Sequence, residues 1–174
     1  MNAQKYTQKS LGAVQAAQAL TIENQNQQIE QVHLLAALLR QDGGLVPQLL
    51  RKMGVTVESL DAAVQQQLEK LPRVTGSGRE ADKYYVARAV DACFTRAEAM
   101  AAEMHDDYVS VEHLFLALLK YPNKAMKEII KEYGITRERF LQALSTVRGN
   151  QRVVSDNPEA TYDTLEKYGY DMVE

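Results

Sequence analysis

The sequence predicts an all-α protein of eight helices, built as a pseudo-symmetric duplication of a four-helix unit. The first observation is an ungapped internal repeat, in which residues 33–39 (HLLAALL) recur 80 residues later as residues 113–119 (HLFLALL). Between residues 17–63 and 97–143, 12 of 47 positions are identical, against roughly 3 expected from average composition. The second observation is that apolar residues recur at three- and four-residue spacing in both halves, which is typical of amphipathic helices. Two copies of so long a unit favour one closed domain over an extended repeat array.

The composition is that of an ordinary globular domain, and it excludes several classes of function. The 174 residues carry a net charge of -3 with both signs interspersed, which argues against a nucleic-acid or anionic-membrane surface. The single cysteine, Cys93, cannot form a disulfide within the chain, and no segment matches a signal peptide or a membrane span. We therefore expect a cytoplasmic protein that binds neither nucleic acid nor membrane.

The first repeat, residues 1–71, is expected to contain four helices. Thr7 precedes apolar residues at helical spacing and is a candidate N-cap for the first helix, which should fade in the polar residues 23–28. The second helix is expected to end near Gln41, before Gly43 and Gly44, and the third at Gly54, because glycine supplies the backbone conformations that a helix end needs. The fourth helix then runs to the end of the repeat.

The second repeat, residues 83–149, is expected to follow the same plan. Residues 72–82 break all periodicity and predict a mobile linker between the two repeats. A long helix should begin at about Lys83, and Ser110 is a candidate cap for the next one. Because the 80-residue offset contains no gap, we expect the repeats to superpose helix for helix, without any strand.

The residues after the second repeat do not continue the repeat pattern. Residues 150–160 are aperiodic and polar, and predict a flexible linker. Residues 161–174 begin a new amphipathic pattern that has no core of its own to join. We expect this last stretch to be the truncated start of a following domain.

The residues that could carry chemistry do not form a recognisable catalytic or metal-binding set. His33 and His113 occupy equivalent repeat positions, so we interpret both as packed core histidines, and Cys93 as a small core residue. Zinc-ligand spacings, a phosphate-binding glycine loop and nucleophile motifs are all missing from the sequence. The sequence therefore predicts a binding module with no catalytic residues, and with neither a metal nor a cofactor in this chain.

Several sequence features recur in a fixed order in the two copies. They are an Ile/Val-x-x-x-His-Leu core helix and a Leu-Leu-x-x-x-Gly-Val or Ile-Ile-x-x-x-Gly-Ile segment before a capped fourth helix, preceded by a helix that enters at Thr7. Together they resemble the Clp N-terminal repeat domain over residues 1–149. The stretch from Asn157 to Asp171 is similar to the linker and the opening of the first nucleotide-binding domain of ClpB-type disaggregases.

This resemblance implies the substrate-binding domain of a hexameric, ATP-driven machine. Such a machine works with the DnaK chaperone system in the stress response and extracts proteins from aggregates. The domain by itself would be monomeric and would bind unfolded or aggregated polypeptides, while ATP, magnesium and a coiled coil would belong to the rest of the protein. The alternative is the adaptor- or degron-docking N-domain of a ClpA- or ClpC-type unfoldase that feeds a protease; the similarity of residues 157–171 favours the ClpB type.

The resemblance also implies a set of site residues, in a groove between the first helices of the two repeats. Thr7, Asp106 and Glu112 would be polar groups at the rim of this groove, where they would bond the backbone of a substrate. Phe94 and Met100, on the first helix of the second repeat, would contribute apolar surface. Helix-capping or bend-forming roles stay open for the polar three, and a core role stays open for the apolar two.

Overall fold

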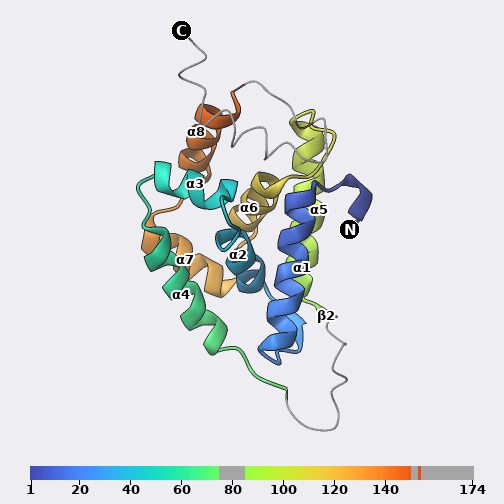
Figure 1. Ribbon diagram of the computed structural model, residues 1–174, viewed down its shortest axis with the longest axis vertical. Coiled ribbons are helices and arrows are strands. Elements are labelled where there is room, and N and C mark those ends of the chain that lie inside the picture. The colour runs from blue at the N-terminus through green and yellow to red at the C-terminus, as the bar shows by residue number, and fades with distance from the viewer. Residues whose placement is uncertain (75–84, 150–152, 154–174) are drawn as a thin grey trace.

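The computed structural model describes residues 1–74, 85–149 and 153, and it places two four-helix units against each other (Figure 1). The first unit follows a 3-10 turn, η1 (Ala3–Lys5), and contains α1 (Gln8–Glu23), α2 (Gln31–Leu39), α3 (Leu45–Lys52) and α4 (Val57–Glu69). The second unit contains α5 (Arg88–Glu103), α6 (Val111–Lys120), α7 (Lys124–Tyr133) and α8 (Arg137–Arg148). The predicted all-α fold, with eight α-helices in the described residues, is confirmed.

The two units match at the 80-residue offset even where the chain bends. After α1 and after α5, one residue adopts the left-handed backbone region, Gln25 with a φ of 58° and His105 with a φ of 60°. Residues other than glycine rarely adopt this region. The same uncommon conformation at equivalent positions shows that the backbone of the bend is duplicated although its sequence is not.

Two short parallel pairings join the units, and the prediction of a structure without strands is wrong here. β1 (Gln28–Ile29) pairs with β2 (Tyr85–Val86), and Tyr6 forms an isolated parallel bridge with Val109. Ile29 and Val109 are equivalent positions, as are Tyr6 and Val86. The bridge is therefore the pseudo-symmetric counterpart of the β1–β2 pair, and both tie the start of one unit to the bend of the other.

The pairing also corrects the predicted start of the second repeat. α5 begins at Arg88 and not near Lys83, because Tyr85 and Val86 are extended in β2. The first residues of the predicted linker, 72–74, lie against the first unit, where the backbone N–H of Val74 donates to the carbonyl of Gln25 at 2.7 Å. The rest of the linker, and residues 150–174 apart from Val153, lie outside the described residues.

The core is built on the two central helices, α2 and α6 (Figure 1). Every residue of α2 is buried, as are residues 111–118 of α6. His33 and His113 are both fully buried, which confirms their predicted core positions, and so is Cys93, where burial raises the pKa of the thiol to about 11. None of the described helices is long and apolar enough to cross a membrane.

Candidate functional site

An apolar groove lies between α1 and α5, the first helices of the two units. It has a volume of about 270 Å³. Its lining is mostly apolar and comes from both units: Met1, Val14, Ala17, Gln18, Ile29, Leu34, Val86, Asp91 and Phe94. Val86 and Met1 remain 42% and 54% exposed, whereas Phe94 is only 5% exposed. The groove therefore has a buried apolar wall and two apolar side chains that contact solvent.

The two ends of the seam between α1 and α5 carry different side chains at pseudo-symmetric positions, and the groove is open to solvent at the end that carries Val86. At the other end, the ring of Tyr6 packs edge-on against Phe94 with 6.4 Å between centroids. The Tyr6 hydroxyl donates to Glu98 at 2.9 Å, and burial, followed by this hydrogen bond, raises the pKa of Tyr6. At the open end the equivalent positions carry Val86 and Gln18. A smaller side chain there leaves the space that Tyr6 fills at the other end.

Two of the site residues that the resemblance implied lie on α5 and are buried. Phe94 forms part of the groove, but Met100 is 3% exposed and does not line it. Thr7 is fully buried and caps α1, with its side-chain oxygen accepting from the backbone N–H of Ser10 at 3.2 Å. The backbone N–H of Thr7 donates to Val109 at 2.9 Å. Thr7 is thus an N-cap, as predicted, and it ties α1 to the bend between α5 and α6.

Asp106 and Glu112 are brought together by a residue that the sequence analysis missed. Arg148, at the end of α8, forms an ion pair with Asp106 and a second ion pair with Glu112 at 3.3 Å. The exposed fractions are 8% for Asp106, 0% for Glu112 and 5% for Arg148. We call these three residues the Arg148 network. Charged groups as buried as these are expected only where they are paired.

The repeat offset contains the signal that could have revealed this network. Each member of the network has a neutral residue at the equivalent position of the first repeat. The equivalent pairs are Asp106 and Asn26, Glu112 and Val32, and Arg148 and Leu68. Leu68 is 2% exposed, so an arginine at its counterpart predicts a buried cation. Two acidic replacements near the same bend supply the compensating charge. The network therefore belongs to the second repeat alone.

A shared histidine contact shows how the two repeats differ chemically. In the first repeat, Nδ1 of His33 accepts from the backbone N–H of Glu30 at 2.8 Å, and Nε2 meets Oδ1 of Asn26 at 2.8 Å. In the second, Nδ1 of His113 accepts from Ser110 at 2.9 Å, and Nε2 meets Oδ2 of Asp106 at 2.8 Å. A ring nitrogen that accepts from an N–H carries no proton, so each neutral imidazole donates through Nε2.

Two ionisable groups at these bends have a lowered pKa, and burial is the cause for only one of them. For His33, burial lowers the pKa to about 4, which keeps the ring neutral. For Asp106, burial alone would raise the pKa. The hydrogen bonds from His113 and from the backbone of Val153, together with the charge of Arg148, outweigh burial and hold the pKa of this carboxyl below its usual range.

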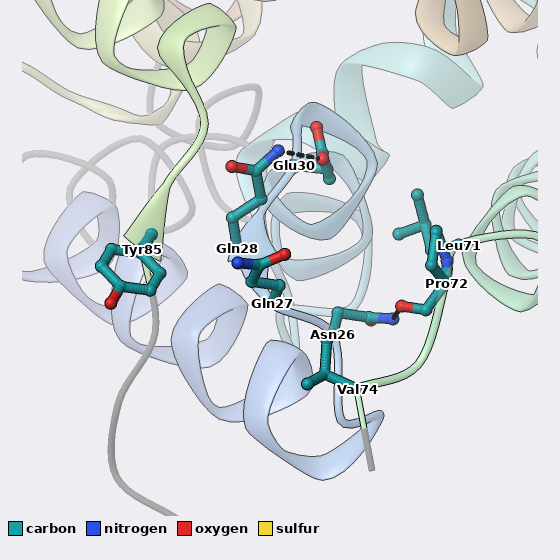
Figure 2. Close-up of a pocket in the computed structure, with 8 residues that line it drawn as sticks. All are labelled: Asn26, Gln27, Gln28, Glu30, Leu71, Pro72, Val74 and Tyr85. Carbon is teal, nitrogen blue, oxygen red and sulfur yellow. Dashed lines mark hydrogen bonds between the residues drawn. The ribbon is translucent and has the colours of Figure 1, made fainter. Parts of the chain in front are cut away.

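Two other cavities are lined more by polar groups. One, of about 360 Å³, lies beside the bend after α1 (Figure 2) and is lined by Asn26, Gln27, Gln28, Glu30, Leu71, Pro72, Val74 and Tyr85. The other, of about 550 Å³, is lined by Lys52, Met53, Arg139, Gln142, Ala143 and Thr146. Figure 2 shows the amide of Gln28 bonded to Glu30, so polar groups of this lining are already paired within the domain; this hydrogen bond is 2.8 Å long.

In the part of the chain that the structure describes, no group of three or more histidine, cysteine, aspartate or glutamate residues could hold a metal ion.

The sequence and the fold both match known proteins. Residues 5–133 match the family model of the Clp repeat (R) N-terminal domain. The chain belongs to this family. It is 42% identical over 173 residues to the chaperone protein ClpB of Bacillus anthracis, and 41% identical over 175 residues to that of Nitratidesulfovibrio vulgaris. These alignments cover 99% and 100% of this chain, which spans only 20% of the length of each relative.

Solved structures share the fold at lower sequence identity. The Hsp104 N-terminal domain from Candida albicans superposes with a TM-score of 0.77 at 22% identity, covering 89% of this chain and 99% of that one. A ClpV N-domain in complex with a VipB peptide superposes with a TM-score of 0.64 at 21% identity, covering 89% and 90% of the two chains. The eight-helix arrangement is therefore common to N-domains of several Clp-type proteins.

Proposed function

We propose that this Clp N-terminal domain captures exposed apolar segments of unfolded or aggregated polypeptides in the groove between α1 and α5. In this proposal it is the mobile appendage of a hexameric, cytoplasmic ClpB-type disaggregase, which works with the DnaK system under stress and hydrolyses ATP in its other domains. The observation that carries the proposal is the apolar lining of the groove, with Val86 and Met1 still exposed beside it. Exposed apolar side chains around a cavity are typical of a binding site.

The size of the groove suits short segments rather than folded partners. A volume of about 270 Å³ has room for only a few side chains. Fully burying one valine, leucine or phenylalanine contributes about 1.5–3 kcal/mol, and the entropy lost on association offsets part of it. Binding should therefore be weak and broadly selective, which suits the capture of heterogeneous aggregates.

We assign different roles to the implied site residues. Phe94 would contact the substrate directly, while Gln18 and Asp91, which also line the groove, would bond the substrate backbone. Thr7, Asp106, Glu112 and Met100 are buried, and would support binding by fixing the positions of α1, α5 and the bend between α5 and α6.

A second candidate is the docking of one specific peptide from a partner protein. It is favoured by the likeness to the ClpV N-domain, whose structure holds a VipB peptide. The ClpA- or ClpC-type adaptor-docking function belongs to the same class. The two candidates differ in selectivity, because a capture groove should bind many unrelated apolar sequences with similar weak affinity, and a docking site should prefer one.

Replacing Val86 with glutamate is expected to weaken binding of an apolar peptide by about five- to tenfold. Val86 is exposed beside the groove, so the change removes apolar contact area and adds a charge that must lose water when a peptide docks. The pairing of β2 uses the backbone and should persist. Fluorescence anisotropy of a labelled leucine-rich peptide measures the effect.

The matched control is Tyr121→Glu, which removes an exposed apolar side chain outside the groove. Tyr121 is 52% exposed and does not line this cavity. Its substitution should leave the peptide affinity unchanged. Equal loss in both variants, or no loss with Val86→Glu, would contradict the assignment of binding to the groove.

A further inference from the structure

Two contacts fasten the chain at Val153 to the bend between α5 and α6. The backbone N–H of Val153 donates to Oδ1 of Asp106 at 2.8 Å, and the carbonyl of Val153 accepts from the backbone N–H of Asp107 at 2.6 Å. Val153 is fully buried although it lies beyond α8, in the stretch that the sequence predicted to be a flexible linker. A buried side chain and two backbone hydrogen bonds indicate docking at a defined place.

The carboxylate that binds the backbone of Val153 is held in place by other side chains of the second repeat. Oδ1 of Asp106 accepts from both Val153 and Arg148, while Oδ2 accepts from His113. Arg148 is shared with Glu112, which in turn accepts from the hydroxyl of Ser110. Both oxygens of the Asp106 carboxylate are therefore fixed by side chains other than Val153.

The first repeat shows why a carboxylate is needed here. Asn26, the counterpart of Asp106, also accepts from a histidine, but its amide nitrogen donates to the carbonyl of Pro72 at 3.1 Å. In the first repeat, the side-chain amide nitrogen of Asn26 is a donor, and the backbone group that it meets is an acceptor. In the second repeat the group to be held is the N–H of Val153, and an amide nitrogen, which is itself a donor, cannot accept from it.

We propose that the Arg148 network is a receptor for the protein's own chain at Val153, and that it holds this residue against the bend between α5 and α6. Asp106, Glu112 and Arg148 are three of the positions at which the second repeat differs from the first, and in this proposal they act together. They convert a neutral helix bend into a charged anchor at the repeat from which the chain continues. This role is distinct from the contacts that a peptide would make in the groove.

The substitution Asp106→Asn tests the anchor with little disturbance to the fold. The asparagine oxygen can accept from His113, as Asn26 accepts from His33, and Arg148 keeps Glu112 as a partner. The amide nitrogen then faces the N–H of Val153, so two donors meet and the hydrogen bond is lost. Hydrogen exchange by NMR on the full chain should show the Val153 amide exchanging about tenfold faster or more, with the α2 and α6 amides unchanged.

The control is Asp107→Asn, which removes the same charge from the adjacent, exposed residue and leaves both backbone contacts. Its Val153 amide should exchange as in the wild-type protein. If Asp106→Asn lowers the protection of the whole domain, the triple variant Asp106→Asn/Glu112→Val/Arg148→Leu, which copies the first repeat, is measured instead. Native helices with a fast Val153 amide support the proposal. A slow Val153 amide in a folded variant, or equal acceleration by Asp107→Asn, overturns it.

Discussion

Replacing Arg148 with alanine is expected to lower the free energy of unfolding by about 3–5 kcal/mol, because it leaves buried charge without its partner. Asp106 and Glu112 are 8% and 0% exposed, and both pair with this guanidinium. Two buried carboxylates cannot easily regain water without opening the bend between α5 and α6. Urea unfolding followed by circular dichroism at pH 7 measures the change.

The control restores the arrangement of the first repeat. In the triple variant Asp106→Asn/Glu112→Val/Arg148→Leu, each charged group is replaced by its counterpart from a repeat that folds with the same helices. Replacing a complete buried ion network by packed apolar groups is often neutral or stabilising, so this variant should unfold near the wild-type midpoint. If the Arg148→Ala variant is as stable as the wild-type protein, Asp106 and Glu112 do not depend on Arg148 for compensation of their charge, and the account of the network is wrong.

Acidification from pH 7 to pH 4 is expected to destabilise the domain through His33. Burial lowers the folded-state pKa of His33 to about 4, below the ordinary value of 6.5. The unfolded chain therefore binds the proton first. The stability that depends on neutral His33 is fully present above about pH 6.5 and is lost as the pH falls through about 4, a change of about 3 kcal/mol. Asp106, with its lowered pKa, acts in the same direction at lower pH.

The variant His33→Gln isolates this contribution. Glutamine can accept from the backbone N–H of Glu30, as the third residue of a capping box commonly does, but it does not titrate. The difference in unfolding free energy between wild type and variant should shrink as the pH is lowered from 6.5 to 4. A difference that stays constant over this range would contradict the assignment.

The fold was largely predictable because the repeat and the apolar periodicity can both be detected in the sequence itself. The cap at Thr7 and the core positions of both histidines follow from the chain around them and from the 80-residue offset. The β1–β2 pairing was not predictable, because strands of two residues have no periodicity to detect. It shifted the start of α5 to Arg88.

The site was less predictable, because its properties depend on contacts between distant residues. That Glu112 is fully buried follows from Arg148, 36 residues further along the chain. The shape of the groove depends on Val86, a smaller side chain than Tyr6, its equivalent in the first unit. Phe94 was placed in the groove by resemblance, and only packing distinguishes it from Met100.

The most direct test of the central claim is to map an apolar peptide onto the domain by NMR. If the groove between α1 and α5 captures apolar segments, methyl and amide shifts should change for Val14, Ala17, Val86 and Phe94 during titration with a leucine-rich peptide. The cavity of Figure 2, beside the bend after α1, serves as the internal reference. Shifts confined to that cavity, or to the cavity between α3 and α8, with the groove residues unchanged, would contradict the account.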